Sequence, residues 1–221
     1  MKVTTFKKSA LALVLLQLTF PFFNQVLSAG DSKAKEIIRK VQQKFTKAQT
    51  LEAEFTQTFH WTMVDEVQTF NGKLLIGPGD KFRIETQEQF IICDGKTVWT
   101  YDIPNNQVII DDLQKTESTL LPKKLLVKYS KEFSAKLLGK ETIGGFLCYH
   151  LQLLPHTEDN YIQKMDVWID GKQWITRRLS YVDVNQNVTT YEIKNMILGK
   201  KLSNDLFQFQ FPPQVEVIDM R

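Results

Sequence analysis

The chain has 221 residues, with 28 Lys plus Arg against 25 Asp plus Glu and a formal net charge of +3 at pH 7. Residues 1–30 hold three of the lysines and no acidic residue, so without them the charges balance at 25 of each sign. This length is ample for one domain with a sizeable core, and a near-neutral domain is a poor partner for nucleic acid or an anionic membrane surface.

Residues 1–30 have the pattern of a cleavable export signal. Three lysines precede an apolar run over residues 10–18, and Ser-Ala-Gly at 28–30 offers a cleavage site. The run is too short for a transmembrane helix, and Pro21 and Asn24 interrupt the sequence beyond it. We therefore expect a soluble, exported domain over residues 31–221. No Cys lies near the cleavage site, so a lipid-modified N-terminal Cys is not expected.

The mature chain is predicted to begin with one helix and to continue as strands. Asp31 or Ser32 can cap a helix that ends near Ala48, because apolar residues recur at helical spacing across this segment. From Leu51 the apolar period changes to two, which predicts a strand. Further strands are predicted over residues 67–76, 81–86, 88–93, 96–101, 107–111, 134–140, 146–154, 161–170, 174–183 and 188–197.

Two Asp-Gly pairs predict hairpin turns between these strands. Asp94-Gly95 and Asp170-Gly171 each suit a turn that needs a positive φ. The stretch around the first turn, "IICDGKTVWTY", is apolar on both faces, because Ile91 and Cys93 point one way and Ile92 the other. A half-buried antiparallel strand normally has one apolar face, so both faces of this hairpin must be covered.

A second helix is predicted over residues 118–133. Pro122 fits its first turn, and Tyr129 continues an apolar stripe that begins with four leucines. No second helical layer is available to bury this stripe, so it must cover the sheet or guard a hollow in it. The chain closes with a short helix over residues 202–207 and an extended tail.

These elements predict an α+β fold with a single domain, in which about ten to eleven strands form an antiparallel meander. A sheet of this size tends to curl, so we expect an incomplete, half-open antiparallel β-barrel. Its helices would form a lid over an apolar cavity. The alternative is that the protein's own side chains fill the interior.

Catalysis and metal binding have no support in the sequence. His60, His150 and His156 share no metal-ligand spacing, and there is no nucleophile elbow or phosphate-binding glycine-rich loop. Adjacent carboxylates such as Asp111 and Asp112 point to opposite faces of a strand, so they do not form an acid/base pair. We therefore expect no enzymatic activity, no cofactor and no metal.

The two cysteines leave two alternatives open. Cys93 and Cys148 each lie on a predicted strand, and an oxidising compartment permits a disulfide between them. The sequence does not supply the Cα separation that a disulfide requires. The other interpretation is two buried, unbonded thiols that act as small hydrophobic side chains.

Four segments together carry a resemblance to a known family. They are "LEAEFTQ" at 51–57, the turn and strand at 78–83, "DGKTVWTYD" at 94–102 with Gln107 beyond it, and "FQFPPQVEVID" at 209–219. In this order they resemble the periplasmic outer-membrane lipoprotein carrier family, LolA, over essentially the whole mature chain. The resemblance implies a monomer whose incomplete barrel and helical lid enclose an apolar cavity.

The resemblance also implies a function and partners. Family members collect acylated lipoproteins released from the inner membrane by an ABC-type complex, cross the periplasm and deliver them to an outer-membrane lipoprotein receptor. The receptor is similar in fold but is anchored through an N-terminal Cys, so the lack of such a Cys favours the carrier. A carrier or sensor of another lipid remains the alternative, because the same cavity would accept one.

The candidate acyl-contact residues are apolar side chains of the predicted strands and lid. They are Phe55, Leu74, Ile76, Phe82, Ile84, Phe90, Ile92 and Val98 from the strands, and Leu120, Leu121, Leu125 and Leu126 from the lid. One position departs from the family pattern: Gly77 stands where members carry an Arg that latches the lid. Arg83 is expected to serve another purpose, such as a surface ion pair.

Overall fold

The computed structural model describes residues 29–115 and 132–221, with side chains from residue 31 onward. The expected export signal and almost all of the second predicted helix, including its four leucines, lie outside the described residues. Phe133, placed at the end of that helix by the sequence, is the first residue of a strand.

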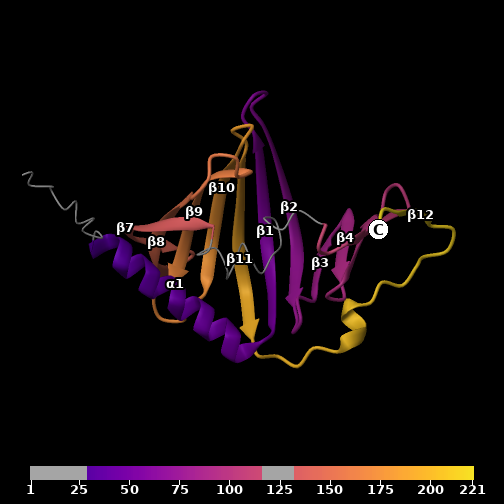
Figure 1. Cartoon of the computed structure of the whole chain (residues 1–221), viewed down its shortest axis with the longest axis horizontal. Helices are drawn as coiled ribbons and strands as arrows, with labels where there is room; N and C mark the ends of the chain where they lie inside the picture. Colours follow the sequence, from indigo (N-terminus) through magenta and orange to yellow (C-terminus); the bar gives the residue numbers. More distant parts are fainter. Residues whose placement is uncertain (1–28, 116–131) are drawn as a thin grey trace, which may run out of the picture.

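One helix and a series of strands make up the described chain (Figure 1). The helix predicted near residues 31–48 is α1 (Ala29–Ala48). The strands and the short 3-10 helix η3 follow: β1 (Leu51–Trp61), β2 (Glu66–Ile76), β3 (Phe82–Thr86), β4 (Gln89–Cys93), β5 (Thr97–Asp102), β6 (Gln107–Asp112), β7 (Phe133–Ile143), β8 (Phe146–Pro155), β9 (Ile162–Asp170), β10 (Thr176–Asp183), β11 (Val188–Leu198), η3 (Asn204–Phe207) and β12 (Glu216–Asp219).

All described strands belong to one sheet of 12 strands, in the order β12-β6-β5-β4-β3-β2-β1-β11-β10-β9-β8-β7. Two antiparallel meanders, β1 to β6 and β7 to β11, join where β1 pairs with β11. The predicted antiparallel meander is therefore confirmed, and the sheet is open because β7 and β12 form its two edges. The extended tail supplies the twelfth strand, which pairs parallel with β6 from Glu216 opposite Gln107.

The sheet has two faces, which we name by what covers them. On the helix-side face, Ile37 and Val41 of α1 pack against Leu151, Val167 and Leu179. Figure 1 shows α1 crossing the β7–β11 half of the sheet. This packing buries the apolar stripe that the helical periodicity predicted.

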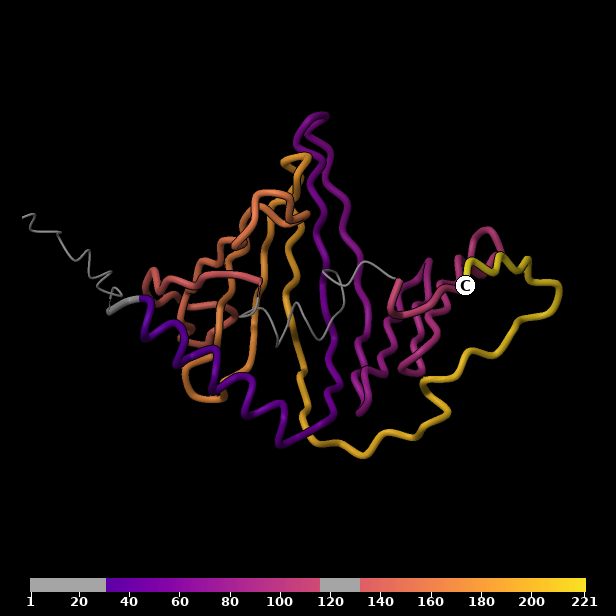
Figure 2. The backbone as a smooth tube through the Cα atoms, in the orientation of Figure 1, coloured from indigo at the N-terminus to yellow at the C-terminus, as the bar shows by residue number. Residues whose placement is uncertain are grey.

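The tail-side face is covered, over β3 to β6, by the C-terminal segment that runs on from β11. Phe209 of this segment stacks on Trp99, with ring centroids 6.4 Å apart, and lies 5.8 Å from Tyr101. Figure 2 shows the segment leaving β11, passing β3 and β4, and ending at the edge strand. The hairpin "IICDGKTVWTY" is therefore apolar on both sides because the chain's own tail covers one of them.

The two predicted Asp-Gly turns form by different means. Gly95 has φ +100°, and the Asp94 carboxylate accepts hydrogen bonds from the backbone N–H groups of Lys96 and Thr97. In the second turn the positive φ belongs to Trp174 and not to Gly171. That turn is longer because β10 begins only at residue 176, so its left-handed residue falls later than the Asp-Gly pair indicated.

Candidate functional site

On β1 to β5 the helix-side face carries a continuous set of apolar side chains, which we call the apolar surface; most of them are buried, and Phe45 of α1 packs among them. Phe55, Leu74 and Ile76 lie in one buried cluster with Phe45, Leu51, Ala53 and Ile193. Phe82 and Val98 lie in the neighbouring cluster with Cys93. Ile84 packs against both clusters and joins them. The structure thus brings six of the candidate acyl-contact residues together on one face.

Strand register explains this grouping. Opposite residues of paired strands share a face, and Leu74 lies opposite both Ala53 and Ile84. Phe82 lies opposite Ile76 on one side and Cys93 on the other. The same face therefore continues from β1 to β5 without a change of side.

Phe55 occupies a site that a glycine makes possible. A Cβ built on Gly72, directly opposite it, would lie 2.4 Å from Cζ of Phe55. The Phe55 ring also meets the Tyr191 ring edge to face, with centroids 5.9 Å apart. Burial raises the pKa of the Tyr191 phenol, which is hydrogen-bonded to Tyr181, so this side chain stays neutral and presents its ring to the apolar surface.

Two of the eight strand candidates lie on the other face from these six, and their contact with acyl chains stays a prediction. Phe90 and Ile92 pair with Tyr101 and Trp99 and point to the tail-side face. There they line a groove of roughly 500 Å³ together with Arg83 and the C-terminal residues Leu206, Phe209 and Pro212. Alternation along β4 separates Phe90 and Ile92 from Ile91 and Cys93, which lie on the helix-side face.

The lid leucines Leu120, Leu121, Leu125 and Leu126 remain a prediction, because they lie outside the described residues. Leu113, just beyond β6, packs against the cluster of Phe82, Cys93 and Val98.

The two cysteines are free and buried, so the structure has no Cys93–Cys148 disulfide. Cys93 lies on β4 and Cys148 on β8, and β3, β2, β1, β11, β10 and β9 separate them in the sheet. Burial raises the pKa of the Cys93 thiol to about 11 and also raises the pKa of Cys148. Both side chains therefore act as small hydrophobic groups of the core.

Gly77 and Arg83 both contact the C-terminal segment. A Cβ on Gly77 would lie 2.9 Å from Cζ of Phe207, a residue only 2% exposed. Arg83 forms an ion pair with Glu85 and donates a hydrogen bond of 3.3 Å to the carbonyl of Leu206. The ion pair of Arg83 was expected from the sequence, but nothing in the sequence links Gly77 or Arg83 to residues more than 120 places later, so their contacts with the C-terminal segment were not predicted.

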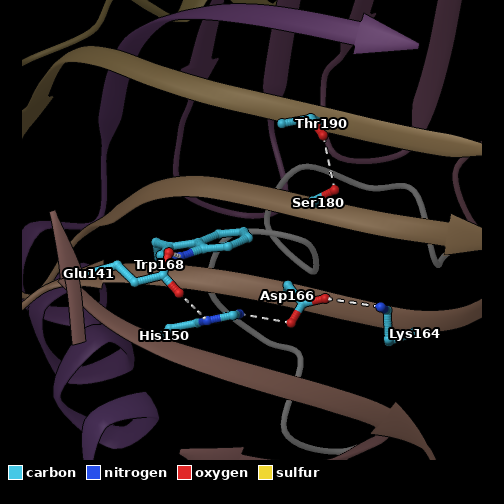
Figure 3. A network of polar contacts seen from close by, with 7 residues as sticks. All are labelled: Glu141, His150, Lys164, Asp166, Trp168, Ser180 and Thr190. Carbon is cyan, nitrogen blue, oxygen red and sulfur yellow. Dashed lines mark hydrogen bonds and ion pairs between the residues drawn. The ribbon is translucent and has the colours of Figure 1, made fainter. Parts of the chain in front are cut away.

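The tail-side face of β7 to β11 carries a polar network (Figure 3). His150 lies between Glu141 at 2.7 Å and Asp166 at 2.8 Å, and its ring stacks on Trp168. Both ring nitrogens are engaged, so His150 has none to spare for a substrate or a metal. In residues 29–115 and 132–221, no group of three or more His, Cys, Asp or Glu is placed to hold a metal ion.

Among the described residues, none of the helices has the length and apolar character needed to cross a membrane. The fold and this surface define a class of protein: a single open sheet with a helix and a wide apolar area on the same face. Similarity to known proteins identifies the family to which the chain belongs.

The family model described as "Outer membrane lipoprotein carrier protein LolA" matches residues 46–210. An outer-membrane lipoprotein carrier protein of Haemophilus influenzae is 32% identical over 224 residues, which span 100% of this chain and 99% of that one. The chain belongs to the LolA family. The members of this family are carriers and not enzymes, as the sequence led us to expect.

Two further similarities are more distant. An uncharacterised protein of Methanocaldococcus jannaschii, MJ0687, is 26% identical over 184 residues, and the chain spans about half (52%) of that protein's length. A solved structure of an uncharacterised conserved protein from Thermus thermophilus has a TM-score of 0.59 at 15% identity, covering 85% of this chain and 99% of that one. This structural likeness supports the fold alone.

Proposed function

We propose that this protein binds the acyl chains of lipoproteins on its helix-side apolar surface and carries them through the periplasm from the inner to the outer membrane. Family membership over residues 46–210 supports the class of cargo. The observation that carries the proposal is the joining of two apolar clusters through Ile84 into one surface on β1 to β5.

The free energy of acyl-chain exposure explains why a carrier is needed. Burying a CH₂ group is worth about 0.8 kcal/mol, so two or three acyl chains exposed to water would cost tens of kcal/mol. A lipoprotein would not leave a membrane at a useful rate without a protein surface to receive those chains. The carrier must also bind more weakly than its destination, and an open sheet that covers only part of the acyl chains meets both needs.

The proposal includes partners at both membranes. An ABC-type complex of the inner membrane would load the protein, and an outer-membrane lipoprotein receptor would unload it. Export by the leader over residues 1–30 would place a monomer between them, and the pattern of lysines followed by an apolar run supports this step.

Mass spectrometry of the molecules that co-purify with the exported protein tests the proposal. The protein is taken from the exported compartment without detergent, so that bound cargo is retained. Acylated lipoprotein in stoichiometric amount is the expected result. Free lipid would favour a carrier or sensor of another lipid, and an empty protein that also fails to bind a fluorescent acyl probe would contradict an acyl-binding function.

A further inference from the structure

The hairpin of β1 and β2 projects beyond its neighbours and carries an exposed apolar tip. Met63 is 91% exposed, Val64 67% and Val67 57%. On one side β3 pairs with β2 only from Gly72 to Ile76, so residues 66–71 of β2 extend past it. Figure 1 shows the hairpin standing above the rest of the sheet.

The tip is held in place although its apolar side chains are exposed. The Thr62 hydroxyl donates a 2.7 Å hydrogen bond to the carbonyl of Gln186 in the turn after β10, and His60 and Asp65 are 2.9 Å apart. Turns normally favour Gly, Asn, Asp, Ser and Pro. Met63 and Val64 occupy this turn with most of their surface exposed, so packing in the fold does not account for them.

An aromatic row connects the tip with the apolar surface. Phe55, Phe59 and Trp61 alternate along β1 on the helix-side face, and the Phe59 and Trp61 rings meet with centroids 4.2 Å apart. Gln57 interrupts this row with a polar side chain, and Phe70 of β2 lies directly opposite it on the same face. Apolar rings thus continue from the cluster of Phe55 to the exposed turn.

We propose that Met63, Val64 and Val67 dock into the interfacial region of a lipid bilayer of near-neutral surface charge. While the inner-membrane complex loads the protein, the aromatic row leads the acyl chain from the docked tip toward the helix-side surface. This second step rests on the function proposed above, whereas the docking of the tip does not.

Size and charge favour a bilayer over a protein partner. A specific protein interface buries about 800 Å² per partner, which three side chains at one narrow turn cannot supply. An aliphatic tip with a Trp behind it matches the order of groups across a membrane interface, where Trp lies at headgroup depth. Asp65 and Glu66 beside the tip disfavour an anionic surface, so the bilayer is zwitterionic.

The docking is weak and reversible. A single myristoyl chain gives a binding constant of about 10⁴ M⁻¹, and three short side chains bury less apolar area than that chain. A shuttle needs a contact of this strength, because firm insertion would hold it at the membrane. Binding is therefore expected at millimolar lipid and not at micromolar lipid.

Co-sedimentation with phosphatidylcholine vesicles tests the docking. The protein is purified after export, with its N-terminus determined, so that the leader does not contribute. The test variant is Met63→Glu with Val64→Glu. The matched control, Val217→Glu with Met220→Glu, adds the same charge at exposed apolar positions near the C-terminus.

We expect the unaltered protein to bind at millimolar lipid, the tip variant to bind at least fivefold more weakly, and the control to be unchanged. Vesicles of phosphatidylglycerol should bind more weakly than phosphatidylcholine. No binding by the unaltered protein, or equal binding by the tip variant, would overturn the proposal. So would a tip variant that loses cargo transfer while its vesicle binding is unchanged, because the tip would then contact a protein.

Acyl-probe binding without vesicles separates this proposal from the proposed function. Both double variants should bind the probe as the unaltered protein does, because their substitutions lie outside the helix-side clusters. Loss of probe binding by the unaltered protein would count against the carrier function, while the vesicle experiment would still decide the docking of the tip.

Discussion

Gly77 and Phe207 pack so closely that a Cβ on Gly77 would lie 2.9 Å from Cζ of the Phe207 ring. Family members are expected to carry an Arg at this position. In this chain the C-terminal segment packs against Gly77, which has no side chain that could donate a hydrogen bond to a lid. The lid predicted over residues 118–133 would then be held by apolar contacts.

Gly77→Ala should lower the free energy of unfolding by about 1–3 kcal/mol, because Phe207 is buried and cannot move aside without strain. Denaturant unfolding measures the change. Gly139→Ala is the matched control, since a Cβ there meets nothing within 4 Å. Equal stability of the two variants would show that Phe207 has room to move.

Arg83→Ala should loosen the C-terminal segment. It removes the ion pair with Glu85 and the hydrogen bond to the Leu206 carbonyl, which together stabilise the folded state by about 1–2 kcal/mol. Hydrogen exchange over residues 203–215 should become faster, with little change in α1. Arg221→Ala, which removes an ion pair with Asp219 at the exposed chain end, is the control.

Local rules predicted most of the fold, and register explains what they did not predict. The helix, eleven strands and both hairpins follow from apolar period and turn residues, and their bounds agree with the structure within a few residues. The side of the sheet that each strand presents depends on distant pairing. Phe90 and Ile92 were therefore grouped with Phe82 and Ile84, although alternation places them on opposite faces.

The tail shows the same limit. The sequence predicted that the tail is extended but not that it pairs in parallel with β6, because this pairing joins residues about a hundred places apart. No local pattern indicates such a partner. The aromatic residues Trp99 and Tyr101 were visible as a second apolar face, and only the tail's position shows that Phe209 covers it.

Stability should fall as the pH rises above about 9, because burial raises the pKa of Cys93 to about 11. A raised pKa means that the folded state holds its proton more firmly than the unfolded state does. The resulting stabilisation is complete below the unfolded pKa and is lost as the pH approaches 11. Burial also raises the pKa values of Tyr181 and Tyr191, which adds to the loss at the upper end.

Cys93→Ala isolates the thiol's contribution. Between pH 9 and 10 its free energy of unfolding should decline less steeply than that of the unaltered protein, measured by urea unfolding at each pH. Below pH 8 the two slopes should coincide. Dithiothreitol should leave the melting temperature of the unaltered protein unchanged, because both thiols are free. A shift on reduction would contradict the structure.

Ile84 and Phe90 test which face of the sheet receives acyl chains. Both are half-buried side chains on adjacent strands, but Ile84 lies on the helix-side face, where it joins the two apolar clusters, and Phe90 lies in the groove beneath the tail. Ile84→Ser should weaken binding of a fluorescent acyl probe by about tenfold, since an aliphatic side chain that becomes fully buried against an acyl chain contributes roughly 1.5–3 kcal/mol, and the half-buried Ile84 gains part of this on binding. Phe90→Ser should leave probe affinity within twofold and instead increase hydrogen exchange in the tail.

Circular dichroism and thermal unfolding confirm that each variant is folded before affinities are compared. The reverse pattern, with Phe90→Ser losing the probe and Ile84→Ser keeping it, would move the acyl site to the tail-side groove.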